Sequence, residues 1–259
     1  MKQANKFLTS VLASLAIILM AYFRVAAADP SALYQEGNRL YEAEKYNEAI
    51  QSYLTAADAG FAAPELYFNL GNAFYKSGDY PSAILYYERA LKLAPADPDV
   101  LYNLKMANLH TVDKIEPLPK VFYEKWAESF LYGKSLTGRT WTAIALLWAA
   151  VGLIGIYLFA GNVRLRKAAF IFGFILLISS TLTYIFAWNQ SAHFNTQKEA
   201  VVFSESVYIK SSPDEKSSSL FMLHSGTKVQ ILDELKDWKK VRIANGNEGW
   251  IGSADVKGI

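Results

Sequence analysis

Two long apolar runs dominate the distribution of hydrophobic and polar positions along the chain. Residues 141–160 and 168–188 contain no charged side chain, and each run holds about 20 residues, enough for a helix to cross the hydrocarbon core of a membrane. We therefore expect two transmembrane helices, with Ala145 and Ala149 of the first as a pair of small residues suited to helix contact. The alternative is a buried helical hairpin in a soluble protein, but such helices usually carry polar residues at helical spacing.

The polar segment between these runs, residues 161–167, predicts the orientation of the hairpin. It carries Arg164, Arg166 and Lys167, and short loops rich in Arg and Lys stay on the cytoplasmic side of a membrane. We expect a cytoplasmic loop in a multi-pass protein of the cytoplasmic (inner) membrane. Both large flanking regions then face the periplasm.

Residues 1–28 are typical of a secretory signal peptide. Lysines precede an apolar stretch, and the small residues 26–28 come directly before Asp29. The apolar stretch is long for a signal, and Arg24 falls where a neutral residue is usual, so an uncleaved anchor is the alternative. Either form exports the chain that follows, in agreement with the orientation of the hairpin.

A period of about 34 residues runs through residues 29–113. The positions that recur are Gly37 with Gly71, Tyr46 with Tyr80, Ala49 with Ala83, Tyr53 with Tyr87, and Ala56 with Ala90. The second copy resembles a tetratricopeptide repeat nearly throughout. We predict two such repeats, at 30–63 and 64–97, each a pair of antiparallel helices, followed by a capping helix.

The first helix of each pair forms the inner surface of such a stack, where the sequence predicts a groove for a protein segment. The candidate groove residues are Tyr34, Asn38, Tyr41, Phe68, Asn72, Tyr75 and Tyr102. Aromatic rings supply contact area and amides hydrogen-bond a peptide backbone. A carboxylate clamp of the kind found in this repeat class is incomplete, because Tyr34 and Asn103 stand where cations are expected. Alternatively, Asn38 and Asn72 are ordinary repeat composition.

Residues 114–140 read as a linker that contains an amphipathic helix. Pro117 and Pro119 interrupt helix formation, and Phe122, Trp126 and Phe130 then recur every four residues on one helical face. We expect this aromatic face to lie along the membrane interface before the first span. Packing against the repeats is the alternative.

Residues 198–259 change to short alternating strands and predict a small all-β barrel. The pairs Val229 with Ile231 and Val241 with Ile243 alternate as core positions, and Asn245-Gly246 is a hairpin signal. The segment resembles a bacterial SH3-type domain, whose implied ligands are cell-wall peptides or protein segments. The candidate groove aromatics are Tyr208, Trp238 and Trp250. Trp250 fits a core position equally well.

Composition narrows the chemistry. The chain has no cysteine, which excludes disulfides and thiol chemistry. Residues 29–113 hold 12 Asp and Glu against 6 Lys and Arg, which argues against a nucleic-acid partner. The sequence shows no nucleophile with a base, no phosphate loop and no metal cluster, and His110, His193 and His224 stand apart. We expect no catalytic, metal or cofactor site, and therefore no enzyme.

The order of these segments resembles the BatE-type members of the Bacteroides aerotolerance family across nearly the whole chain. That resemblance implies other Bat membrane proteins as partners, including von Willebrand factor A-type members, with a MoxR-type ATPase and a role in oxygen or stress tolerance. The residues themselves indicate a membrane-anchored envelope adaptor that scaffolds protein–protein interactions. The alternative is an accessory protein that binds murein peptides of the cell wall through the SH3-type module.

Overall fold

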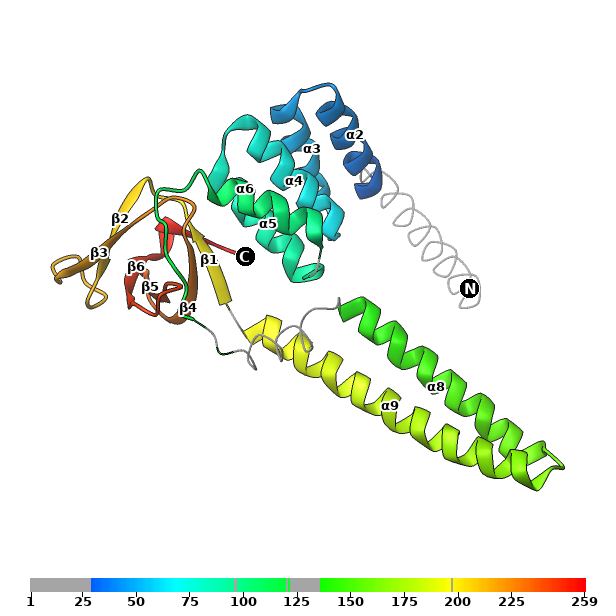
Figure 1. The fold of residues 1–259 in the computed structure, drawn as a ribbon. Helices are drawn as coiled ribbons and strands as arrows, with labels where there is room; N and C mark the ends of the chain where they lie inside the picture. The colour runs from blue at the N-terminus through cyan, green and yellow to red at the C-terminus, as the bar shows by residue number, and fades with distance from the viewer. Residues whose placement is uncertain (1–28, 96, 120, 122–135, 197) are drawn as a thin grey trace, which may run out of the picture. The chain divides into compact units, whose positions relative to one another are not determined.

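The computed structural model describes residues 29–95, 97–119, 121, 136–196 and 198–259 (Figure 1). The chain divides into two compact units, residues 1–62 and 63–259. The predicted fold class is confirmed: an all-helical repeat region is followed by two long apolar helices and then by a seven-stranded antiparallel sheet. The predicted signal segment and the aromatic face of the predicted interfacial helix lie outside the described residues.

The repeat region consists of five helices whose ends carry local start and stop signals. The helices are α2 (Pro30–Glu42) and α3 (Tyr46–Asp58) in the first unit, and α4 (Pro64–Ser77), α5 (Tyr80–Leu93) and α6 (Pro98–Asn108) in the second. Asp29, Asp79 and Asp97 each cap the helix that follows by accepting a hydrogen bond from a backbone N–H in its first turn. Gly78 ends α4 with a φ of 86°, the left-handed conformation that favours glycine. The helix boundaries are therefore set by a few residues beside them.

The α6 helix packs on the second helix pair as a cap. Val100 and Ala107 of α6 are 1% and 0% exposed and share a cluster with Ala83, Tyr87 and other α5 residues. Tyr102, on the same helix, is 62% exposed. One side of α6 thus closes the apolar side of α5, while the other side meets solvent.

The two apolar runs form the helices α8 (Leu136–Phe159) and α9 (Val163–Thr196), which contact each other along their length. Segments 136–159 and 163–191 are long and apolar enough to cross a membrane. Ala143 and Ala150 are buried, and the Ser180 hydroxyl donates to the Ala143 carbonyl at 2.8 Å. Ala145 and Ala149, the pair suggested by the sequence, are exposed instead. The position of α9 determines which face of α8 is buried. The spacing of small residues within α8 alone does not identify that face.

The connection between α8 and α9 is shorter than the predicted loop of residues 161–167. Helix α9 begins at Val163, because the Asn162 side chain accepts hydrogen bonds from the backbone N–H groups of Arg164 (2.8 Å) and Leu165 (3.4 Å). Arg164, Arg166 and Lys167 therefore stand on the first turns of a helix. The direction in which each of these cations points therefore depends on its position around α9.

The C-terminal segment folds into one sheet with strand order β3-β2-β6-β5-β4-β1-β7. The strands are β1 (Lys198–Val202), β2 (Ser206–Lys210), β3 (Ser219–His224), β4 (Lys228–Leu235), β5 (Trp238–Arg242), β6 (Glu248–Gly252) and β7 (Val256–Gly258). They confirm the run of short strands predicted for residues 198–259. The seventh, β7, has only three residues and pairs with β1 at the sheet edge.

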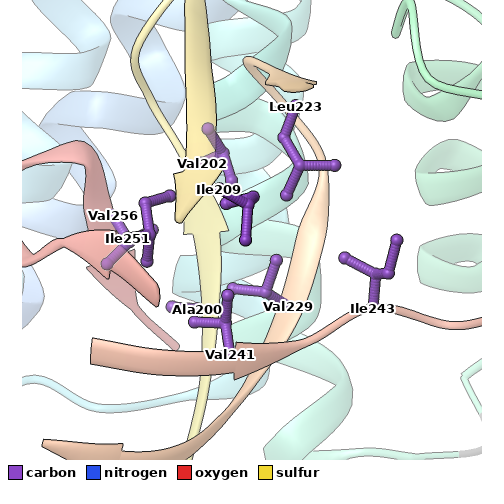
Figure 2. Close-up of a cluster of buried hydrophobic side chains, with 9 residues drawn as sticks. All are labelled: Ala200, Val202, Ile209, Leu223, Val229, Val241, Ile243, Ile251 and Val256. Carbon is purple, nitrogen blue, oxygen red and sulfur yellow. The ribbon is translucent and has the colours of Figure 1, made fainter. Parts of the chain in front are cut away.

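Figure 2 shows the core of this sheet, in which nine aliphatic side chains converge from different strands. They are Ala200, Val202, Ile209, Leu223, Val229, Val241, Ile243, Ile251 and Val256. Of the two predicted core pairs, Val229, Val241 and Ile243 are buried, with Ile243 directly after β5, whereas Ile231 is only partly buried and packs against the cluster. Gly246, in the Asn245-Gly246 turn, has a φ of 89°. Glycine adopts this backbone conformation with little strain, and the turn it forms connects β5 to β6.

Candidate protein-interaction surfaces

The first repeat places two of its predicted groove residues, Tyr34 and Asn38, around the buried ring of Tyr53. A Cβ atom at Gly37 would lie 2.4 Å from the Tyr53 ring, so only glycine lets α2 approach the ring this closely. The Tyr53 hydroxyl donates to the Asn38 side-chain oxygen at 2.8 Å. Tyr34 contacts the rings of Tyr53 and Phe61, with centroids 5.9 and 5.3 Å away. Asn38 therefore holds the repeat together and is also partly exposed.

Tyr41 lies at the other end of α2. Its ring meets the Tyr46 ring edge-on, with centroids 5.3 Å apart. Partial burial, with a smaller contribution from Tyr46, raises the pKa of the Tyr41 hydroxyl above its ordinary value. At neutral pH Tyr41 is therefore a neutral group that offers both a hydroxyl and a ring face.

The second repeat reproduces the arrangement of the first. A Cβ atom at Gly71 would lie 2.5 Å from the Tyr87 ring, and the Tyr87 hydroxyl donates to the Asn72 side-chain oxygen at 2.8 Å. Asn103 of α6 donates a second hydrogen bond to the same oxygen, also at 2.8 Å. Phe68 packs 6.1 Å from Tyr87, centroid to centroid. The Asn72 oxygen is thus occupied by the fold, whereas the amide nitrogen of Asn72 makes no hydrogen bond within the described part of the chain.

Tyr75 forms an aromatic cluster that the sequence did not indicate. The His110 ring stacks on Tyr80 with centroids 3.9 Å apart, and Tyr75 packs edge-on against both rings. The Tyr75 hydroxyl and the His110 Nε2 are 3.4 Å apart. Because His110 follows α6 and the tyrosines belong to α4 and α5, only the folded chain brings the three rings together. The sequence alone shows only that His110 stands apart from the other two histidines.

The predicted groove residues therefore fall into two sets that the structure describes separately. Tyr34, Asn38 and Tyr41 belong to the first unit, while Phe68, Asn72, Tyr75 and Tyr102 belong to the second. The first set comes from successive turns of α2 and the second from successive turns of α4, with Tyr102 added from α6, and all seven side chains are at least partly exposed. That all seven line one continuous groove stays a prediction.

The outer face of the barrel presents the aromatics predicted for the SH3-type module. On β6, Trp250 lies between the buried residues Gly249 and Ile251, so its side chain points away from the core. Its paired neighbours are Lys210 of β2 and Lys240 of β5. Of the two interpretations of Trp250, the structure favours the surface.

Tyr208 and Trp238 occupy flanking strands. Tyr208 on β2 is 58% exposed and pairs with Met222 of β3, which is 41% exposed. Trp238 begins β5, opposite Gly252 of β6, and is partly exposed. The three aromatics thus belong to the adjacent strands β2, β6 and β5, with lysines among them.

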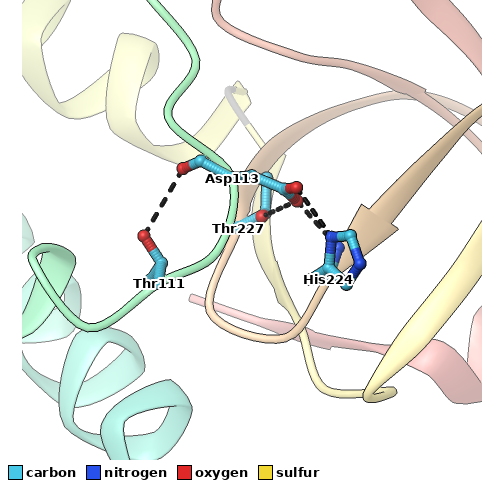
Figure 3. Close-up of polar contacts among 4 residues, drawn as sticks. All are labelled: Thr111, Asp113, His224 and Thr227. Carbon is cyan, nitrogen blue, oxygen red and sulfur yellow. Dashed lines mark hydrogen bonds and ion pairs between the residues drawn. The ribbon is translucent and has the colours of Figure 1, made fainter.

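Asp113, in the segment that follows α6, joins that segment to the barrel (Figure 3). Its carboxylate accepts hydrogen bonds from the His224 backbone N–H (2.7 Å), from the His224 Nδ1 (2.8 Å) and from the Thr227 hydroxyl (2.6 Å). Burial alone would raise the pKa of the Asp113 carboxyl, but the hydrogen bonds from Thr227 and His224 outweigh it and hold the pKa below its ordinary value. His224 is thus a junction residue and not an isolated one.

Helix α5 and the barrel make a second set of contacts within the same unit. The Lys228 ammonium bridges Glu88 of α5 at 2.8 Å and Glu199 of β1 at 2.9 Å. Burial opposes the charged form of Lys228, yet the two carboxylates together hold its pKa above the ordinary value. Val201 of β1 is fully buried in the cluster formed by α5 and α6 residues. The second repeat, the segment around Asp113 and the barrel therefore make one connected block.

Metal binding has no candidate in the part of the chain that the structure describes. There, no group of three or more His, Asp or Glu side chains is placed to hold a metal ion. The polar clusters present, such as the one around Asp113, connect segments of the fold.

Two segments match models of known families. Residues 34–98 match the tetratricopeptide repeat, and residues 205–257 match the bacterial SH3 domain. The comparison with curated proteins found no match. Both domain types are interaction modules without catalytic machinery, so the general class of function to which the chain points is protein–protein interaction.

Several solved structures resemble parts of the chain. The first tetratricopeptide domain of Spaghetti, bound to an HSP90 peptide, is 23% identical, with 32% of this chain and 68% of that chain covered and a TM-score of 0.30. The Yersinia enterocolitica type III secretion chaperone SycD, in complex with a peptide of YopD, is 14% identical, with 62% and 98% covered and a TM-score of 0.31. The C-terminal SH3 domain of myosin IB from Entamoeba histolytica is 25% identical, with 24% and 93% covered and a TM-score of 0.18.

Proposed function

We propose that this chain is a membrane-anchored adaptor that scaffolds protein partners on the outer side of the cytoplasmic membrane. The observation that carries the proposal is the connected block of the second repeat and the barrel, joined through Asp113 with His224 and Lys228 with Glu88. Two interaction modules held in one block present their surfaces to partners in a defined relation. Binding one partner at each surface would bring the two partners together without any chemical step, so the adaptor needs neither a catalytic residue nor a cofactor.

The hairpin of α8 and α9 supports the anchoring part of the proposal. Most of its large apolar side chains are exposed, including Trp148 at 69% and Phe172 at 60%. Such a surface is unfavourable in water and stable in lipid. The cations near residue 166 and the exported N-terminus predicted from the sequence both favour a cytoplasmic turn with both modules in the periplasm. The resemblance to the BatE-type family supports an aerotolerance or stress complex as the setting.

Site-specific photocrosslinking in intact cells tests the adaptor. A photoreactive amino acid replaces Tyr75 on the repeat surface or Tyr208 on the barrel, and Glu215, on an exposed barrel loop, is the matched control position. We expect Tyr75 and Tyr208 each to attach defined envelope proteins, with von Willebrand factor A-type membrane proteins among them, and Glu215 to attach none of these. The same products from all three positions would contradict the adaptor.

A reporter that is active only outside the cytoplasm tests the orientation. We expect activity when it follows Ile259 and none when it is inserted at Gly161, in the turn between the helices. Activity at Gly161 would reverse the topology. The test is independent of partner capture, so anchoring and adaptor function can fail separately.

Cell-wall binding through the barrel is the second candidate function. The observation that favours it is the outward Trp250 between Lys210 and Lys240, because an aromatic ring beside cations suits a short peptide that carries carboxylates. Sedimentation of the purified chain with murein decides the matter. Wall binding that is lost in Trp250→Ala and retained in Leu235→Ala would favour this function; no binding by the unaltered chain would exclude it.

A further inference from the structure

The membrane hairpin carries a groove between its two helices near the connecting turn. The groove has a volume of about 470 Å³, including its open side. Its lining is apolar and comes from Ile154 and Tyr157 of α8 and from Phe170, Gly173 and Leu177 of α9, among others. Gly173 lets the helices approach, since a Cβ atom there would lie 3.3 Å from the Leu153 Cβ. An apolar groove of this kind suits a flexible hydrocarbon chain.

Arg166 lies at the end of this groove that is nearest the connecting turn. Residues 166, 170, 173 and 177 are spaced by four, three and four positions, which places them on one face of α9. The Arg166 Nε donates to the Tyr157 carbonyl at 3.1 Å, and its guanidinium lies 5.4 Å from the centroid of the Tyr157 ring. The guanidinium is thus tied to a residue that also lines the groove. Its two terminal nitrogens make no hydrogen bond within the described part of the chain.

The cations near the groove have no acidic residue on the hairpin with which to pair. Residues 136–196 contain neither Asp nor Glu, while Arg164, Arg166 and Lys167 follow one another within a single turn of helix. Unpaired cations at the end of a membrane helix attract anionic headgroups, and basic pockets between helices bind them. A guanidinium also binds a phosphate with two parallel hydrogen bonds.

We propose that the hairpin binds one anionic glycerophospholipid, with its phosphate on Arg166 and one acyl chain in the groove below it. The proposal rests on the membrane anchoring proposed above. Arg164 provides the matched control, because it lies two residues before Arg166 and so about 200° around the helix. Loss of either arginine removes the same charge, but only Arg166 is on the groove face.

Native mass spectrometry of the full chain in mild detergent, with phosphatidylglycerol or phosphatidylcholine added, tests the proposal. We expect the unaltered chain to retain one phosphatidylglycerol in preference to phosphatidylcholine. Arg166→Gln should reduce that preference about fivefold, as expected for one cation near an anionic surface, and Arg164→Gln should leave it nearly unchanged. Leu177→Trp, which fills the groove and keeps the charges, should lower retention of both lipids.

Equal retention of both lipids by the unaltered chain, or an equal loss in the two arginine variants, would overturn the lipid site. Alkaline extraction of membranes from the same cells separates this failure from failure of the anchor. A chain that stays in the extracted membranes without any lipid preference contradicts the lipid site alone. A chain released by the extraction contradicts both the anchor and the lipid site.

Discussion

Gly71→Ala is a substitution for which helix propensity and packing predict opposite signs. Alanine in place of glycine within a helix stabilises a protein by about 0.5–1 kcal/mol. At position 71, however, the new methyl group would lie 2.5 Å from the Tyr87 ring, about 1 Å closer than an ordinary contact. Tyr87 is 1% exposed, so its ring has no solvent to move into.

The packing penalty should exceed the propensity gain. Overpacking of a close-packed core typically costs about 1–3 kcal/mol, and the fixed ring puts this site in the upper part of that range. Subtracting the propensity gain of about 0.5–1 kcal/mol from a penalty of about 2–3 kcal/mol leaves a net destabilisation of about 1–2.5 kcal/mol. The Tyr87 hydroxyl bond to Asn72 adds to the cost if the ring shifts.

Hydrogen exchange of the full chain in detergent measures this change, because α4 and α5 amides report the local free energy of opening. We expect faster exchange in Gly71→Ala and a less than additive effect when Tyr87→Leu is combined with it, since the smaller side chain makes room for the methyl group. Gly152→Ala in α8 is the control, because a Cβ atom there meets nothing within 4 Å. Slower exchange in Gly71→Ala would show that propensity wins and would refute the packing argument.

Ala83→Leu should destabilise the second repeat by about 1–3 kcal/mol, because Ala83 is fully buried; unchanged exchange in α5 would contradict this. Asn72→Ala should cost about 1–3 kcal/mol in the same assay, because the oxygen accepts two hydrogen bonds, whereas Asn72→Asp keeps an acceptor and should cost less. The hydrogen bonds that ionised Asp113 accepts should stabilise the fold fully above about pH 4, and this stabilisation should be lost as the pH falls through the depressed pKa of Asp113. The His224 amide should therefore exchange faster in acid, beyond the intrinsic rate change. Asp113→Ala should abolish this pH dependence.

Local signals in the sequence specify the helices and strands of this protein and their order. Asp79 and Asp97 begin their helices, Gly78 ends one, and alternation at Val229 and Val241 identifies core positions of strands. These signals act within a few residues, because caps, turns and side-chain periodicity depend on neighbouring atoms of the same segment. The membrane-length helices belong to the same class, since length and polarity suffice to identify them.

Candidate residues were harder to assign from sequence. The period in the repeats placed Asn38 and Asn72 at equivalent positions, but it did not indicate that each oxygen accepts a hydrogen bond from a tyrosine 15 residues later. The sequence does contain a signal for this contact, because a glycine and a tyrosine recur with each asparagine at the same spacing. Spacing alone does not say which ring lies under which glycine, because that depends on how two helices pack.

Which distant segments meet is visible only in the folded chain. Asp113 contacts His224 across 111 residues of sequence, and Lys228 reaches Glu88 across 140. Likewise, the face of α8 that meets α9 contains Ala143 and Ala150, while the more obvious alanine pair faces outward. Such contacts depend on the simultaneous packing and desolvation of several segments, and no local pattern within any one segment encodes that arrangement.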